Sequence, residues 1–157
     1  MFENIIKNVH NRHPLIHCIT NYVSINDCAN IVLACGGAPI MAEDINEVSQ
    51  ITSICQGLDI NIGMLNDNKL SSMLKAGATA NELGIPVILD PVGAGSSDYR
   101  IKAVQNLMSN VQFGVIRGNV SEIKAIAAKQ GIHNIAAGVY DTMQKDKSAM
   151  GVEAGIA

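Results

Sequence analysis

The chain has 157 residues, of which 48% are hydrophobic and 16% are charged, a balance typical of a packed globular protein rather than a disordered one. The net charge of −3 provides no basic surface for nucleic acid, and no apolar run is long enough to span a membrane. Aromatic residues make up 3% and tryptophan is absent, so the core of the single domain expected over residues 1–157 must be aliphatic.

Short apolar runs alternate along the chain with segments of helical spacing. The runs, each expected to form a strand, are Leu15–Thr20, Ala38–Ala42, Leu58–Ile62, Pro86–Asp90 and Phe113–Arg117. Apolar residues recur at helical spacing over residues 25–33, 70–81, 101–108 and 123–127. Because the runs are continuously apolar, the pattern predicts an α/β fold whose mostly parallel sheet carries helices on both faces.

The C-terminal region is less regular. Ile135–Val139 fits either a sixth strand or a loop, and Lys145–Ala157 resembles the start of a helix. No capping glycine or basic cluster closes that helix. We therefore expect the fold to be truncated at its C-terminus.

The cysteines and histidines do not predict a metal site. Cys18, Cys28, Cys35 and Cys55 lack zinc-site spacing and lie in apolar contexts. Reduced, buried thiols in a cytoplasmic protein fit this pattern better than the two alternatives, a zinc site or a disulfide. Of the four histidines, His10, His13 and His17 lie around the entry to the first predicted strand rather than along one helix, so they do not form a good metal set.

Polar residues, and one glycine, lie at or just after the end of every predicted strand. They are Thr20–Asn21, Glu43–Asp44, Asn61, Gly63, Asp90 and Arg117–Asn119. Because parallel strands end at the same edge of a sheet, these groups together predict a ligand site there. Asp90 is the strongest single candidate, since it ends an apolar strand and precedes Gly93 and Gly95, which allow close backbone approach to a ligand. A turn-capping role for Asp90 fits equally well.

Other residues favour ordinary structural roles. Glu43 and Asp44 fit a solvated loop better than a ligand contact, and Met64 and Met73 fit the core. Neither GxGxxG nor GxxxxGK[ST] is present, so the common dinucleotide-binding and P-loop interpretations lose their main support.

The segment FGVIRGNVSE, residues 113–122, runs from a strand directly into a helix N-terminus. Two interpretations fit it. Arg117 and the helix N-terminus suit a phosphate, and the Glu122 carboxylate suits Mg²⁺. Alternatively, Asn119 and Glu122 form a capping box whose role is confined to folding.

Four longer segments carry a family resemblance. They are PLIHCITNYVSINDCANIVLACGGAPIMAEDINEV, DINIGML, ANELGIPVILDPVGAGSSDYR and VIRGNVSEI, and they extend from Pro14 to about Ala128. Together they closely resemble hydroxyethylthiazole kinase, an enzyme of thiamine salvage in the ribokinase-like superfamily. Long ordered segments in the same order are far more specific than any single short motif.

The resemblance implies a function and a set of site residues. It implies a three-layer ribokinase-like fold, and phosphorylation of the hydroxyl of 5-(2-hydroxyethyl)-4-methylthiazole by ATP with Mg²⁺. It also implies a cytoplasmic homotrimer with active sites between subunits. By motif, the implied residues are Asn21, Met41 and Gly63 for the thiazole, Arg117 and Asn119 for ATP, and Asp90 and Glu122 for the metal.

The resemblance also has a gap. Members of the family are longer and carry a glycine-rich loop with the catalytic residue beyond the position of Ala157, so we expect no catalytic residue in this chain and no activity from it alone. Two alternatives remain. The chain is a non-catalytic truncated subunit that retains thiazole binding or assembly, or, less well supported, another ribokinase-like small-molecule kinase.

Overall fold

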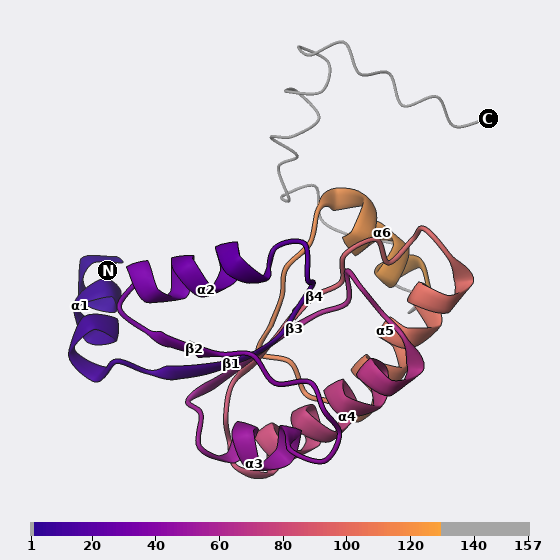
Figure 1. The fold of residues 1–157 in the computed structure, drawn as a ribbon. Coiled ribbons are helices and arrows are strands. Elements are labelled where there is room, and N and C mark those ends of the chain that lie inside the picture. Colours follow the sequence, from indigo (N-terminus) through magenta and orange to yellow (C-terminus); the bar gives the residue numbers. More distant parts are fainter. Residues whose placement is uncertain (1, 130–157) are drawn as a thin grey trace, which may run out of the picture.

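The computed structural model describes residues 2–129, so Met1 and residues 130–157 lie outside the described part of the chain. The alternatives predicted for Ile135–Val139 and the helix start predicted at Lys145–Ala157 therefore fall outside the described residues. Within residues 2–129, strands and helices alternate along the chain, as Figure 1 shows.

The described strands form one sheet. The elements in chain order are α1 (Phe2–Arg12), β1 (Leu15–Ile19), α2 (Ile25–Ala34), β2 (Ala38–Ile40), α3 (Val48–Ser53), β3 (Gly57–Asn61), α4 (Asp67–Glu82), β4 (Val87–Asp90), α5 (Asp98–Asn110), β5 (Val115–Ile116) and α6 (Val120–Lys129). All neighbouring strands pair in parallel, in the order β2-β1-β3-β4-β5. The predicted α/β fold with a mostly parallel sheet is confirmed.

Each predicted strand is present, with its bounds moved by one or two residues at one or both ends. The largest difference is at β5, where only Val115–Ile116 of the predicted Phe113–Arg117 pairs with a neighbour. β5 lies at the edge of the described sheet and has β4 as its partner there. β4 begins just after Pro86, because proline has no N–H to donate to a ladder.

The main core lies between the sheet and helices α3, α4 and α5. Its buried side chains come from alternate positions along the central strands and from the facing helices: Ile19, Leu58, Ile60, Ile62, Val87 and Leu89, with Met73, Ala76, Val104 and Leu107. Burial of each large aliphatic side chain stabilises the fold by about 1.5–3 kcal/mol. Gly77 lets α4 pack closely against Val111, since a Cβ at position 77 would lie 2.5 Å from a methyl group of that valine.

The opposite face of the sheet is less completely covered. The chain runs from β1 to β2 in the opposite direction to the run from β3 through β4 to β5, so right-handed crossovers place α2 on the other side. Figure 1 shows α2 across the sheet from α3 and α4. Helices therefore lie on both faces, as predicted, but α2 has no buried residue. Ile88 and Val115, paired in register on this face, are 41% and 52% exposed.

Several expectations for single side chains can be compared with the structure. All four cysteines are free thiols, as predicted, and Cys18 and Cys55 are buried. Cys28 is only half-buried and Cys35 is exposed, so the predicted burial is wrong for Cys35. Met73 is buried as predicted, whereas Met64 is 41% exposed, because it lies in the loop beyond the end of β3. None of the described helices is long and apolar enough to cross a membrane.

Candidate functional site

The ends of β3 and β4 join two parts of the predicted site. Asn61 and Asp90 are register partners in the last ladder positions of these strands. The side-chain amide of Asn61 donates to Asp90 Oδ2 at 3.0 Å, and Asn61 Oδ1 accepts a hydrogen bond from Gly63 N at 2.8 Å. A single asparagine thus connects the predicted thiazole-binding turn at Gly63 with the predicted metal-binding carboxylate.

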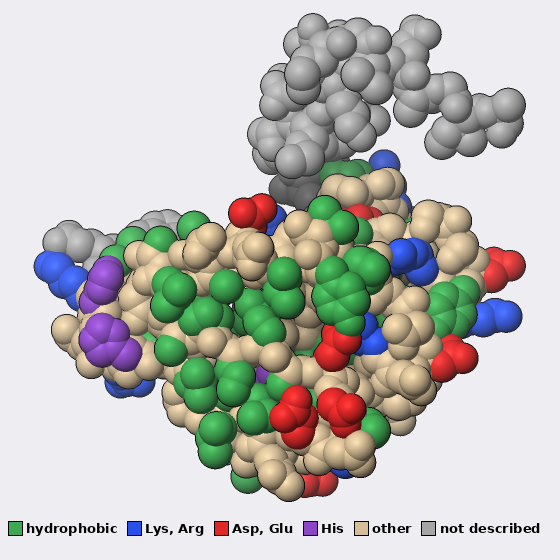
Figure 2. Space-filling model, viewed as in Figure 1, with side chains coloured by type: hydrophobic (Ala, Val, Ile, Leu, Met, Phe, Trp, Pro, Cys, Tyr) green, Lys and Arg blue, Asp and Glu red, His purple; other side chains and the backbone are tan. Residues whose placement is uncertain are grey.

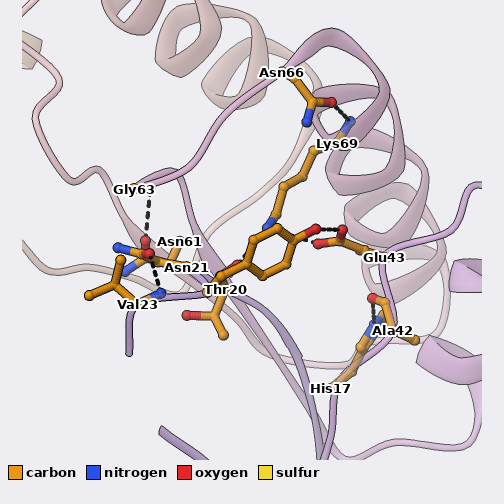
Figure 3. Close-up of polar contacts among 11 residues, drawn as sticks. His17, Thr20, Asn21, Val23, Ala42, Glu43, Asn61, Gly63, Asn66 and Lys69 are labelled. Carbon is orange, nitrogen blue, oxygen red and sulfur yellow. Dashed lines mark hydrogen bonds and ion pairs between the residues drawn. The ribbon is translucent and has the colours of Figure 1, made fainter. Parts of the chain in front are cut away.

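Asn21 and Gly63 lie against each other, as Figure 3 shows. A Cβ on Gly63 would be 2.6 Å from Asn21 Nδ2 and 2.9 Å from Asn61 Oδ1, so only glycine allows the two loops to close to this distance. The other end of the Asn21 amide, Oδ1, accepts a hydrogen bond from Val23 N at 2.9 Å and orders the turn after β1. Two of the three predicted substrate residues are therefore neighbours.

Met41, the third predicted substrate residue, directly follows β2, which lies beside β1 in the sheet. The residue after Met41 is Ala42, and its carbonyl oxygen lies 2.8 Å from Nε2 of the buried His17. His17 Nδ1 lies 2.9 Å from the Thr52 hydroxyl. Burial lowers the pKa of His17 below its usual value, which favours the neutral ring. A carbonyl oxygen can only accept, so Nε2 donates to Ala42.

Asp90, at the end of β4, contacts both Asn61 and Arg117. Its half-buried carboxylate accepts from Asn61 and lies 3.5 Å from Arg117 Nη1. Burial raises the pKa of Asp90 and nearby Glu122 adds to the rise, while Arg117 and the Asn61 hydrogen bond oppose it. A turn-capping Asp90 would accept hydrogen bonds from the loop that follows it, whereas these contacts are with Asn61 and Arg117.

The Arg117 guanidinium lies at the solvent edge of the site. Its side chain is 79% exposed, whereas its backbone N–H is anchored to Leu89 O at 2.9 Å. A fixed backbone and a largely exposed head group suit an arginine that turns toward an incoming anion.

Glu122 joins the start of α6 to the glycine turn after β4. Glu122 Oε2 accepts from Asn119 N at 2.8 Å, and Asn119 Oδ1 accepts from Glu122 N at 2.9 Å, which is the reciprocal capping box. Glu122 Oε1 accepts from Gly93 N at 2.9 Å. The predicted capping contacts are therefore present, and the carboxylate also holds the Gly93 turn in place.

A hollow of about 600 Å³ lies between the glycine turn and the α6 N-terminus, lined in part by Gly93, Gly95, Asn119, Glu122 and Lys124. The positive end of the helix dipole and the Lys124 amine favour an anion in this hollow. Among the described residues, no three His, Cys, Asp or Glu side chains are grouped to hold a metal ion. One or two carboxylates still suit Mg²⁺, which commonly completes its coordination with phosphates and water.

Arg100 and Glu43 also shape the site, through contacts that the sequence did not predict. Arg100 in α5 donates through Nη1 to the carbonyl oxygens of Ile62 and Val92, at 2.6 and 2.9 Å, and through Nη2 to that of Gly63 at 2.8 Å. Glu43 lies in a loop and its side chain is 39% exposed, as predicted for a solvated residue, but its carboxylate also pairs with the buried Lys69 at 2.8 Å. Glu43 and Lys69 are far apart in the sequence, and the partners of Arg100 are backbone carbonyl groups. No local sequence pattern therefore predicts either set of contacts.

The model of the hydroxyethylthiazole kinase family matches residues 6–156. The hydroxyethylthiazole kinase of Clostridium acetobutylicum is 57% identical over 147 residues, covering 93% of this chain and 54% of that protein. The hydroxyethylthiazole kinase of Methanobrevibacter smithii is 47% identical over 145 residues, covering 90% of this chain and 50% of that protein. This chain therefore spans about half the length of these curated relatives.

A solved structure agrees with these matches. The structure of the hydroxyethylthiazole kinase protein from Pyrococcus horikoshii OT3 aligns with a TM-score of 0.79 at 40% identity. The alignment covers 82% of this chain and 50% of that one, so the similarity extends over most of the described fold.

Proposed function

This chain belongs to the hydroxyethylthiazole kinase family, and on that premise we propose that it binds a thiazole alcohol and Mg²⁺–ATP for transfer of the γ-phosphate to the alcohol. The alcohol proposed is 5-(2-hydroxyethyl)-4-methylthiazole. Because the chain spans about half of its curated relatives, the proposal concerns binding and metal-holding roles and assigns no catalytic residue to this chain.

The acceptor side of the site is proposed to be formed by Asn21, Met41 and Gly63. The contact of Asn21 with Gly63 and the position of Met41 on the adjacent strand end support this assignment. An amide and a thioether beside a glycine turn suit a small, flat, weakly polar ring.

The phosphate side is proposed to be formed by Arg117 and Asn119, with Asp90 and Glu122 as the metal-holding carboxylates. Mg²⁺ would neutralise charge on the phosphate oxygens when bound. Arg117 would contact a phosphate, and the N-terminus of α6 would favour the anion electrostatically.

The observation that carries the proposal is the line of contacts from Asn21 through Gly63 and Asn61 to Asp90 and Arg117. It supports the proposal because the residues proposed for the acceptor adjoin a carboxylate and an arginine, an arrangement in which an alcohol and a transferring phosphate would be neighbours. We further propose that the protein is a cytoplasmic homotrimer with sites between subunits. Light scattering of the purified protein tests the trimeric state.

Calorimetric titration tests the binding roles. Asn21→Ala is expected to weaken binding of the thiazole alcohol by about tenfold while leaving Mg²⁺–ATP binding unchanged, because one contact with the ring is lost. Asn26→Ala, which removes an exposed asparagine of α2, is the matched control. Absence of thiazole binding to the wild-type chain contradicts the proposal; binding without turnover in a coupled ATP assay supports a binding role alone.

A further inference from the structure

One lysine is buried where three segments meet on the acceptor side of the site. Lys69 lies in the first turn of α4, and its side chain is only 3% exposed. Its backbone N–H is held by the helix cap, donating to Asn66 Oδ1 at 2.8 Å. Burial of an ammonium group is costly unless its hydrogens find partners, so the partners of Lys69 must be close and well placed.

The ammonium group of Lys69 has three partners from two different loops. Nζ donates to the carbonyl oxygen of Thr20 at 2.5 Å and pairs with Glu43 Oε2 at 2.8 Å. It also lies 4.5 Å from the centre of the Tyr22 ring, within the range of a cation–π contact. The Tyr22 hydroxyl in turn donates to Glu43 Oε1. Figure 3 shows Lys69 reaching from α4 toward Thr20 and Glu43.

These partners adjoin the residues assigned to the acceptor pocket. Thr20 immediately precedes Asn21, and Glu43 is two residues beyond Met41. Lys69 therefore holds the backbone of the loop after β1 and a side chain of the loop after β2 at the same time. The phosphate side is organised by other groups, since Asp90 contacts Asn61 and Arg117, and Glu122 contacts Asn119 and Gly93.

We propose that Lys69 is a positioning residue that sets the relative placement of the Asn21 and Met41 loops, and so determines the fit of the acceptor alcohol. The identity of the acceptor rests on the function proposed above, whereas the link between the loops does not. A lysine that served only solubility would lie in water, whereas this one is enclosed by the loops that it joins.

Amide hydrogen exchange in the wild-type chain and in Lys69→Met tests the link directly. Methionine keeps the apolar stem and removes the N–H donors. Exchange over residues 20–24 and 41–47 is expected to be about tenfold faster, while that of β3 and β4 is unchanged. Lys102→Met, at an exposed lysine of α5, is the matched control and should match the wild type.

Exchange that is unchanged in the two loops overturns the proposal, and so does equal acceleration throughout the chain, which would indicate general destabilisation. If Lys69→Met does not fold, Glu43→Gln replaces it, because this change removes the ion pair and leaves the hydrogen bond to Thr20. A smaller acceleration confined to the same two loops is then expected, and no acceleration there contradicts the link.

Titration with two ligands tests the consequence for binding. Lys69→Met is expected to weaken 5-(2-hydroxyethyl)-4-methylthiazole binding by about tenfold and to change Mg²⁺–ATP binding by less than about twofold. Unchanged thiazole affinity, or equal loss for both ligands, overturns the positioning role. If the wild-type chain binds no thiazole alcohol, the proposed function fails, and the exchange experiment still decides whether Lys69 links the loops.

Discussion

At the scale of single residues, Glu122 makes the capping contacts and can also hold the metal-binding role proposed for it, which the sequence presents as alternatives. Its two carboxylate oxygens accept hydrogen bonds from the backbone N–H groups of Asn119 and Gly93. Each carboxylate oxygen has further acceptor capacity, and the residue lines the hollow at the α6 N-terminus. Capping is therefore compatible with the metal-holding role proposed for Glu122, because it fixes the orientation of the carboxylate.

Glu122→Gln is expected to lower the free energy of unfolding by about 1–2 kcal/mol, because an NH₂ group would face one of the two backbone N–H donors. In titrations of Mg²⁺ at fixed ATP, the variant should need more Mg²⁺ for half-saturation, since the charge is lost. Glu82→Gln, at the exposed end of α4, is the control for charge. An unchanged Mg²⁺ requirement would confine Glu122 to capping.

Asp59 is a carboxylate in the middle of a central strand. It lies on β3, facing the partly covered side of the sheet. Burial raises the pKa of Asp59 to about 6, with nearby Asp90 adding to the rise and Arg117 opposing it. The folded protein therefore binds this proton more tightly than the unfolded chain between about pH 4 and pH 6.

The sign of the pH dependence follows from that difference. The stabilising contribution of protonated Asp59 is complete below the unfolded value of 3.8 and is lost as the pH rises through about 6. Asp59→Asn, which mimics the protonated form, should raise the free energy of unfolding at pH 7 by about 1–2 kcal/mol and have little effect near pH 4. Urea unfolding at several pH values measures it. The exposed Asp27→Asn should not reproduce this pH-dependent gain.

At the scale of secondary-structure elements, α5 holds the loops after β3 and β4 through one side chain. The Arg100 guanidinium donates to three carbonyl oxygens, of Ile62, Gly63 and Val92. These contacts align the predicted thiazole-binding turn with the glycine turn that Glu122 also holds. Helix α5 thus stabilises the positions of two loops of the candidate site through Arg100.

Arg100→Met is expected to lower the free energy of unfolding by about 2 kcal/mol, because three carbonyl groups lose a charged donor. The affinities for thiazole alcohol and Mg²⁺–ATP should both fall, since both loops move, which distinguishes Arg100 from Lys69. Urea unfolding and calorimetry check the two effects, with Lys102→Met on the same helix as the control. A loss restricted to one ligand would show that the two loops do not move together.

At the scale of the whole molecule, the two faces of the sheet differ. The face against α3, α4 and α5 is closed, whereas the face carrying α2 leaves Ile88 and Val115 partly exposed. Ile31 and Leu33 of α2 are also 62% and 56% exposed. Hydrophobic side chains gather between α2 and α3 in the view of Figure 2 as well. Apolar surface of this extent favours association.

The purified chain is therefore expected to self-associate, and light scattering after size-exclusion chromatography should detect species larger than a monomer at tens of micromolar. The double change Ile88→Gln/Val115→Thr should reduce association, because it removes neighbouring apolar groups from the open face. Leu83→Gln, at the exposed end of α4, controls for general solubility. A monomeric wild-type chain that unfolds cooperatively would contradict the prediction.

Periodicity alone located the strands and most of the helices of the described chain, because burial on one or two faces leaves a local record in the order of apolar residues. The rule that parallel strands share an edge also placed Asn21, Asp90 and Arg117 at strand ends. The capping box of Asn119 and Glu122 is equally local, since its partners are three residues apart. The sequence by itself therefore determined the fold class and the edge at which the candidate site lies.

Only the tertiary structure decided which of these residues touch. The insertion of β1 between β2 and β3 brings Asn21 against Gly63 and places Lys69 within reach of Thr20 and Glu43. The partial exposure of Met64 and the burial of Asp59 likewise depend on distant segments. The physical reason is that hydrogen bonds to backbone carbonyls and desolvation depend on proximity in space, and neither leaves a periodic pattern along the chain.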